Sequence, residues 1–181
     1  SGKTLSGAIT VTAGSIKLGE TGTLGTTVSM SGGTLDADES LTLSGTLSQS
    51  GNITIDVAED KTLTYTRAAL YLGANTLTLS GGGTLSNTNA SALFLSHSSS
   101  KLLLNSITVS YVRILSGSTL GLDVDDDSTV TSLITSLITP ISIASGKTLS
   151  GAITVSGGSI KLGEAGTLAS SVSMSGGKLD V

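Results

Sequence analysis

The chain has no cysteine, no tryptophan and a single proline. The absence of cysteine excludes disulfide bridges and thiolate metal ligands. Aromatic residues make up 2% of the chain and charged residues 12%, about half the usual charged share of a soluble domain. No stretch approaches the roughly 18 consecutive apolar residues of a membrane-spanning helix, so we expect no membrane span. The net charge is −4 and the few basic residues are scattered, so we expect no nucleic-acid partner.

Small and β-branched residues take the place of the missing types. The apolar share is 38%, and it consists almost entirely of Leu, Ile, Val and Ala, while Ser, Thr and Gly dominate the rest. A disordered chain would combine low hydrophobicity with high net charge, and this chain has neither. Abundant β-branched residues with one proline favour strands over helices. The length of 181 residues is enough for one domain with a sizeable core.

The strongest signal is an internal repeat. Residues 1–37 recur as residues 145–181, with 29 of the 37 positions identical, at an offset of 144. Within that unit a Thr-Leu-like step recurs every 19 to 23 residues, with rung starts at residues 4, 23, 42, 62, 84, 107, 129, 148 and 167. Such self-similarity is typical of a solenoid. We expect residues 1–181 to form one solenoid segment, with 1–144 as a seven-rung repeat unit and 145–181 as the start of the next.

Apolar residues fall at +1, +5, +7, +12 and +14 from each rung start. In the second unit they are Leu24, Val28, Met30, Leu35 and Ala37. In the seventh they are Val130, Ile134, Ile141 and Ile143, with Ser136 as an exception. Steps of two indicate half-buried strands, and the Ser and Gly between them indicate turns. The pattern predicts an all-β, right-handed parallel β-helix (β-solenoid), with three short strands per rung of 19–23 residues and about nine rungs.

Two segments carry a family resemblance. Residues 144–151 (ASGKTLSG) and 75–85 (NTLTLSGGGTL) resemble the repeat regions of large bacterial surface adhesins, of the filamentous-haemagglutinin-like and autotransporter-like kinds. The resemblance covers essentially the whole chain and implies a right-handed β-helix, export, and a structural or adhesive role. It transfers no functional residue. Residues 62–128 depart from the regular 19-residue pattern.

Acidic residues recur three positions before a rung start, which predicts a single corner column of carboxylates. Neighbouring rungs lie about 4.8 Å apart, so stacked carboxylates would repel, and Ca²⁺ prefers several such oxygen ligands. The alternative is a solvated corner that keeps the protein soluble. The densest acidic stretch is residues 123–127. The calcium candidates are Asp123, Asp125, Asp126, Asp127, Glu20, Glu39, Glu59 and Glu164.

Charged and aromatic residues add three further hypotheses. Lys17 and Asp36 occupy the same place in successive rungs, and Lys161 and Asp180 repeat them, so we expect stacked ion pairs. The single histidine, His97, lacks the partners of a catalytic or metal site. The four aromatic residues form either core packing or a surface patch for glycan stacking, and they are Tyr65, Tyr71, Phe94 and Tyr111.

These observations predict a structural shaft or fibre segment of a large, repetitive, secreted or cell-surface protein, and not an enzyme. The candidate partners are further copies, stacked end to end or side by side, and cell-surface glycans. One alternative is an ice-binding solenoid with the threonine pairs 10/12, 62/64, 76/78 and 129/131. Another is a β-helical polysaccharide lyase or hydrolase, which needs paired carboxylates in a cleft. No cofactor other than calcium is expected.

Overall fold

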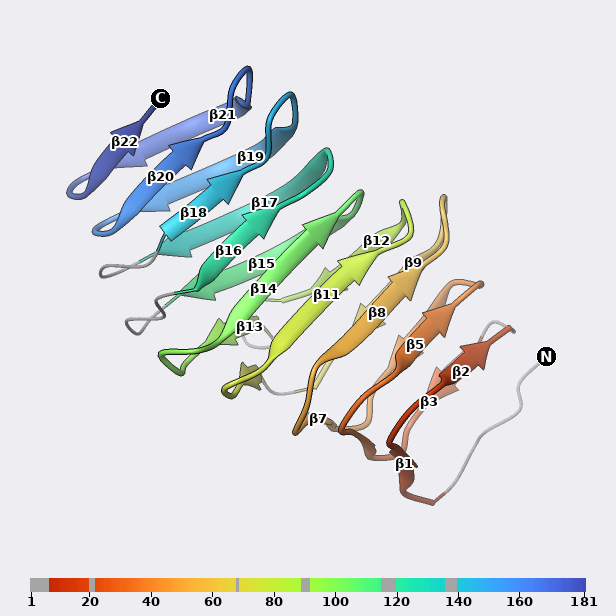
Figure 1. Cartoon of the computed structure of the whole chain (residues 1–181). Coiled ribbons are helices and arrows are strands. Elements are labelled where there is room, and N and C mark those ends of the chain that lie inside the picture. The colour runs from red at the N-terminus through yellow and green to blue at the C-terminus, as the bar shows by residue number, and fades with distance from the viewer. Residues whose placement is uncertain (1–6, 20–21, 68, 89–91, 115–119, 136–139) are drawn as a thin grey trace.

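The chain coils into a parallel β-solenoid. A computed structural model describes residues 7–19, 22–67, 69–88, 92–114, 120–135 and 140–181, and within these ranges it contains strands and turns but no helix. The strand pairs of all three sheets are parallel. In Figure 1 the front strands run to the upper right while the chain advances to the upper left, which makes the coil right-handed. The predicted fold class is confirmed.

The nine-stranded sheet, called sheet I, runs the length of the coil. One strand from every rung enters it, so its nine strands span about eight turns. Its strands are β2 (Ser15–Leu18), β5 (Thr34–Ala37), β8 (Ile53–Val57), β11 (Thr76–Ser80), β14 (Lys101–Asn105), β16 (Gly121–Val124), β18 (Pro140–Ile143), β20 (Ser159–Leu162) and β22 (Lys178–Asp180).

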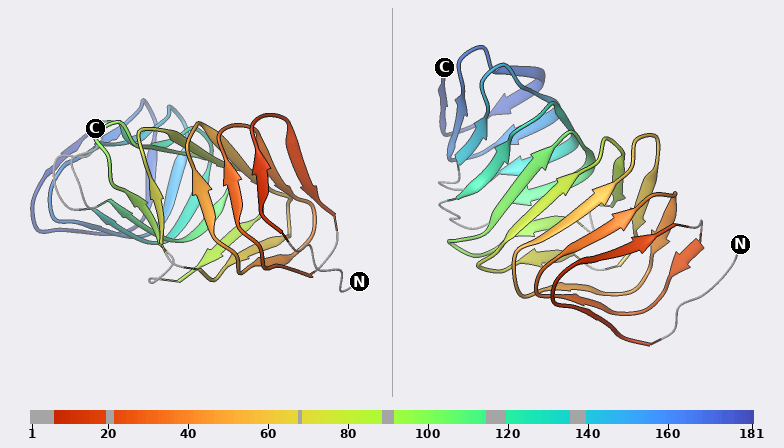
Figure 2. Two further views of the ribbon diagram at one scale, coloured as in Figure 1. Left: turned by 90° about the horizontal axis from the view of Figure 1, so that it is seen from below. Right: turned by 45° about the vertical axis from the view of Figure 1, so that its right-hand side comes forward.

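The other two sheets divide the coil into two regions. Sheet II has ten strands, namely β3 (Gly22–Leu24), β6 (Leu41–Leu43), β9 (Thr62–Tyr65), β10 (Leu70–Leu72), β12 (Thr84–Asn87), β13 (Leu93–Leu95), β15 (Thr108–Ile114), β17 (Ser128–Thr135), β19 (Thr148–Val155) and β21 (Thr167–Met174). Sheet III has three, namely β1 (Ile9–Val11), β4 (Val28–Met30) and β7 (Leu47–Gln49). From β15 onwards one longer strand covers both faces, because β13 pairs with the second half of β15. Figure 2 shows the rungs stacked in order along the coil.

The core consists of inward columns of Leu, Ile and Val, as the alternation predicts. All five apolar positions of the second unit are buried. In the seventh unit the prediction that Ile134 points inward is wrong, because its neighbours Leu133 and Thr135 are buried and Ile134 is half-exposed. The corner within β17 has two residues between the inward Val130 and Leu133. The corner of β19 has three, and the β17–β19 pairing has an irregularity there.

In the sixth rung Thr108, not Ile107, occupies the place of the rung start, because it pairs with Thr84 and with Thr129. Two further steps along sheet II differ from the expected spacing. Thr42 pairs with Thr64 rather than with Thr62, and Thr129 pairs with Ser150 rather than with Thr148. Both shifts are of two residues. An even shift keeps each side chain on the same face of the sheet, so Leu149 still points inward, opposite the buried Ser128. The rung starts therefore do not form one column, and the corner residues before them do not either.

Candidate functional site

The corner before sheet II is built around a left-handed backbone position two residues ahead of a strand. Asp60, Ser106 and Ala165 have φ of 60°, 55° and 56°, and Gly82 and Gly146 have φ of 81° and 68°. The left-handed conformation costs roughly 1 kcal/mol at a residue that carries a Cβ. The corner thus prescribes backbone shape and leaves the choice of side chain open. Of the acidic residues singled out by the sequence, Glu59 and Glu164 lie directly beside these left-handed positions.

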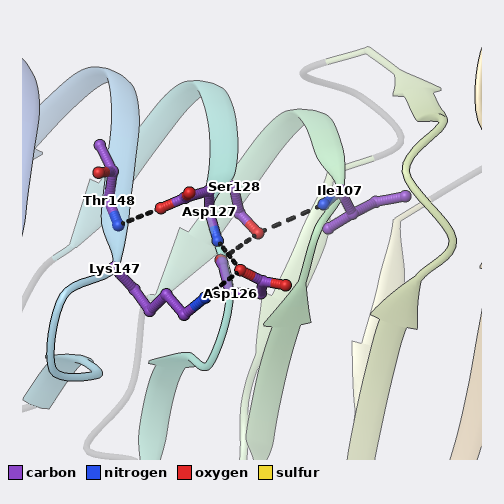
Figure 3. Close-up of polar contacts among 6 residues, drawn as sticks. All are labelled: Ile107, Asp126, Asp127, Ser128, Lys147 and Thr148. Carbon is purple, nitrogen blue, oxygen red and sulfur yellow. Dashed lines mark hydrogen bonds and ion pairs between the residues drawn. The ribbon is translucent and has the colours of Figure 1, made fainter.

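Figure 3 shows the corner where the register shifts between β17 and β19. Lys147 Nζ lies 2.7 Å from Asp126 Oδ1 in the preceding rung. The backbone N–H of Thr148 donates to Asp127 Oδ1 at 2.7 Å, and the N–H of Asp127 donates to Asp126 Oδ1 at 2.9 Å. Thr148, the first residue of β19, has no pairing residue in β17, so its N–H donates to a side chain instead of to a backbone carbonyl. We call this arrangement a corner clamp.

The same clamp occurs at the other register shift, between β6 and β9. Lys61 Nζ lies 2.9 Å from Glu39 Oε2, and the N–H of Thr62 donates to Ser40 Oγ at 3.0 Å. An acid and its following residue in one rung therefore hold a lysine and its following threonine in the next. Two unrelated local sequences, Glu39-Ser40 and Asp126-Asp127, make the same pair of contacts.

The clamp changes the protonation behaviour of its charged groups. The hydrogen bond from Lys147, assisted by that from the N–H of Asp127, lowers the pKa of the Asp126 carboxyl. The same bond with Asp126 raises the pKa of the Lys147 amine. Both side chains are partly exposed, so solvent screens the pair and its contribution to stability is small.

The expectation of a single column of stacked carboxylates is wrong. The register shifts put Lys61 beside Glu39 and Lys147 beside Asp126, where the spacing had placed Glu59 and Ser145. Asp123 is likewise 2.6 Å from Lys101 Nζ.

The remaining calcium candidates lie apart. Asp125, Glu59 and Glu164 are exposed at corners, and Glu20 lies outside the described residues. Across the described ranges no three His, Cys, Asp or Glu side chains gather where they could hold a metal ion. Calcium binding stays a prediction without the carboxylate–carboxylate contact that suggested it.

A shallow, open hollow of about 560 Å³ lies at the corner of the middle rungs. It is lined by Asp56, Glu59, Ser80, Gly81, Gly82, Asn105 and Ser106. The hollow contains two carboxylates, those of Asp56 and Glu59. Asp56 Oδ1 accepts a hydrogen bond from Ser80 Oγ of the next rung at 2.5 Å, so one of the two is already engaged. The hollow is polar and wide, and its residues continue the corner that the clamps occupy elsewhere.

Lys17 and Asp36 are neighbours in adjacent strands, as expected, but the expected ion pair between them is not formed. The two residues are directly opposed between β2 and β5. The Lys17 amine, however, lies 2.5 Å from Asp38 Oδ2, and this bond raises the pKa of Lys17 and lowers that of Asp38. Partial burial raises the pKa of Asp36. In the second copy Lys161 again opposes Asp180, and Asp180 pairs with Lys178 at 2.5 Å.

The four aromatic residues divide between core and surface. Tyr65 is buried in the core, and burial raises its pKa. Tyr71 and Phe94 lie side by side on the outer face, with Arg113 over Phe94. Tyr111 is half-buried. His97 Nδ1 accepts a hydrogen bond from the N–H of Ser99, within its own turn.

Threonine hydroxyls form columns on the outer face of sheet II. One column is Thr62, Thr84, Thr108, Thr129 and Ser150, each paired with the next. A second is Thr23, Thr42, Thr64 and Ser86. The predicted pairs 62/64 and 129/131 lie on this sheet, whereas 76/78 lies on sheet I and Thr10 on sheet III.

One signal in the sequence could have found the clamps. The triplet Lys-Thr-Leu occurs at residues 3–5, 61–63 and 147–149, and two of these three triplets form the clamps. The register shift itself leaves no local mark, because the threonine spacings at the two shifted steps, 20 and 19 residues, fall within the range of the other rungs. The described residues include no helix long and apolar enough to cross a membrane. Comparison with protein-family models, curated proteins and solved structures gives no match for this chain.

Proposed function

We propose that this chain is a rigid shaft segment of a large, repetitive, exported protein. The observation that carries the proposal is the continuity of the stack: sheet I takes one strand from each rung, and its inward residues are buried from β5 to β18, with exposure only at the two ends of the coil. The strand β2 (Ser15–Leu18) also recurs as β20 (Ser159–Leu162), at the offset of the sequence repeat. Rung-to-rung contacts of this kind make stability and stiffness grow with length.

Rung stacking gives the shaft a definite rise. Parallel strands lie about 4.8 Å apart, so a seven-rung unit adds roughly 34 Å to the long axis. Because Val181 aligns with Ala37 in the repeat, residues 38–181 appended after Val181 would continue the pattern in register. The same edge-to-edge strand pairing would join separate copies end to end, since an open sheet edge templates association.

The test compares the chain with a version extended by residues 38–181. Small-angle X-ray scattering and negative-stain electron microscopy should show one straight rod that is longer by about 34 Å, with an unchanged cross-section. The urea m-value should rise in proportion to the added buried surface. Two globular bodies joined by a flexible link, or a particle that widens instead of lengthening, would refute the shaft.

One observation favours a second candidate, ice binding. The column from Thr62 to Ser150 places five hydroxyl residues in direct register, and Thr64 and Ser86 add a parallel column beside part of it. Strand spacing and the two-residue step give these hydroxyls a grid of about 4.8 by 6.6 Å. An ice-recrystallisation assay on the chain and on Thr84→Lys tests this role: inhibition that the substitution abolishes would support it, and equal growth of ice crystals would exclude it.

A further inference from the structure

The outer face of sheet III continues into sheet II as one column of central side chains. Each member is paired in register with the next through parallel strand pairing, with one exception. Between β7 and β10 the strands are in contact but are not hydrogen-bonded as a ladder. In chain order the column is Thr10, Ser29, Ser48, Tyr71, Phe94, Arg113, Ile134, Thr154 and Ser173. Hydroxyls occupy its two ends, and two of the four aromatic residues of the chain occupy its middle.

The three middle residues form one stack. The rings of Tyr71 and Phe94 have centroids 5.1 Å apart and an interplanar angle of 28°. The guanidinium carbon of Arg113 lies 5.5 Å from the centroid of Phe94. Stacked rings and a cation over an aromatic face both attract, and together they fix the orientation of Phe94.

Core packing does not explain the placement of this stack. Leu93 and Leu95 of the same strand point into the core, so Phe94 points outward, where it contacts Tyr71 and Arg113 of the column. Tyr71 points outward between the buried Leu70 and Leu72, and 62% of it is exposed. A large aromatic ring is therefore displayed on the surface, next to the small hydroxyl residues at the N-terminal end of the column.

A displayed, rigidly backed ring is suited to a ligand with a flat face of C–H groups. The aromatic face carries negative charge density, which attracts polarised C–H bonds, and the backing by Phe94 removes the entropic cost of ordering the ring on binding. Next to β10 lies β7, whose exposed Ser48 donates its hydroxyl to Ser29 Oγ at 3.0 Å. Hydroxyl groups one strand spacing apart can pair with the polar rim of the same ligand.

Pyranose rings combine these two properties, because they have a C–H face and a rim of hydroxyl groups. We propose that the Tyr71 platform binds a saccharide chain, with one pyranose ring stacked on Tyr71 and the next residues along the hydroxyls of Ser48 and Ser29. The chain would lie along the axis of the coil, since the column does. Aromatic residues with a few placed polar groups are the usual lining of a small-molecule site. The proposal does not depend on the shaft function.

The test is an NMR titration of the whole chain with ring-labelled tyrosine. Cellohexaose serves as the neutral probe, tetragalacturonate as the acidic probe, and choline as a cation without a sugar ring. The ring signals of Tyr71 should shift with cellohexaose or tetragalacturonate at millimolar concentration, while those of the buried Tyr65 stay in place.

Three variants sharpen the readout. Tyr71→Ala should weaken binding by about tenfold or more, the effect of losing one stacked ring. Tyr71→Phe, which keeps the ring, should bind within about threefold of the parent. Tyr111→Ala, a half-exposed tyrosine outside the column, serves as the matched control and should leave affinity unchanged. Far-UV circular dichroism checks that each variant stays folded. No shift with either saccharide, a shift with choline alone, or unchanged affinity in Tyr71→Ala would overturn the proposal.

Discussion

The same repeat segment adopts two strand patterns at the two ends of the coil. Residues 23–30 cover the last two residues of β3 and all of β4, two short strands in different sheets, separated by a corner. Their counterparts, residues 167–174, form the single strand β21. The segments differ at three positions, where Gly-Thr-Thr at 25–27 is replaced by Ala-Ser-Ser at 169–171. Glycine is a weak strand former and favours the break at the first of these corners.

The pairing of neighbouring rungs also bears on this difference. Residues 148–155 are identical in sequence to residues 4–11, and Gly151 has φ of 118° where Gly7 has 110°. The backbone at the glycine is thus alike in both copies. In the second copy, however, this stretch is paired along its length with β17 and β21 and forms the single strand β19. The comparison indicates that a local sequence sets the corner, while the adjacent rungs decide whether pairing continues through it.

The largest expected effect comes from filling the tight corner of the N-terminal region. A Cβ at Gly45 would meet the backbone oxygen of Thr26 in the rung below, well inside van der Waals contact. Backbone cannot yield as a flexible side chain can, so Gly45→Ala should lower the free energy of unfolding by about 3 kcal/mol. Urea denaturation followed by circular dichroism measures this loss.

Gly25→Ala is the matched control, because it introduces the residue of the second copy. Its Cβ would have Ser44 Oγ as its nearest neighbour, at 3.7 Å, which is an ordinary contact. Reduced freedom of the unfolded chain should then raise stability by about 0.5 kcal/mol. Equal losses in the two variants would show that the corner is not packed as closely as the structure has it.

The corner clamps give the next largest effect. Asp127→Ala removes the acceptor of the Thr148 N–H, and losing such a hydrogen bond should cost about 1 kcal/mol. Ser40→Ala does the same to Thr62 at the other register shift, with a similar cost. Asp125→Ala, at an exposed neighbouring carboxylate, is the control and should change little. Thermal and urea unfolding compare the three variants, and a loss as large in the control would remove the special role of the clamp.

The left-handed corners of the C-terminal rungs offer a reciprocal pair of changes. Gly146→Ala introduces a Cβ at φ of 68° with open space around it, so its cost of about 1 kcal/mol is purely conformational. Ala165→Gly relieves the same strain at φ of 56° and should gain up to about 1 kcal/mol. Unfolding free energies of opposite sign are the expected result, and two losses would contradict it.

The fold was predictable because its signal is redundant. Alternating apolar residues such as Leu24, Val28 and Met30 recur in each rung, and a wrong assignment in one rung is corrected by the others. The register was not predictable, because a shift of two residues keeps every side chain on its expected face and leaves the alternation intact. The misplaced Ile134 came from a corner that is one residue shorter, which no spacing rule marks. The lysine partners of Glu39 and Asp126 depend on that register, so the sequence suggested stacked acids instead.

The smallest expected effect is the pH dependence of the two ends, which the ion pairs set. The folded-state pKa of Asp126 lies below its ordinary value, so its contribution is present above pH of about 4 and is lost as pH falls through the folded pKa. The folded-state pKa of Lys147 is raised, so its contribution is present below pH of about 10 and is lost as pH rises through the folded pKa.

At the other end the pair of Lys17 and Asp38 has shifts of the same signs, but Asp36 opposes them. Its pKa is raised, so ionising Asp36 above its folded pKa favours the unfolded state. The two ends should therefore respond differently between pH 3 and 6, the range in which carboxylates titrate. Asp126→Asn should flatten the acid limb of the stability profile, whereas Asp36→Asn should raise stability at neutral pH relative to pH of about 3. Urea midpoints measured across this range distinguish the two, and parallel profiles for both variants would mean that Asp36 is as well solvated as Asp126.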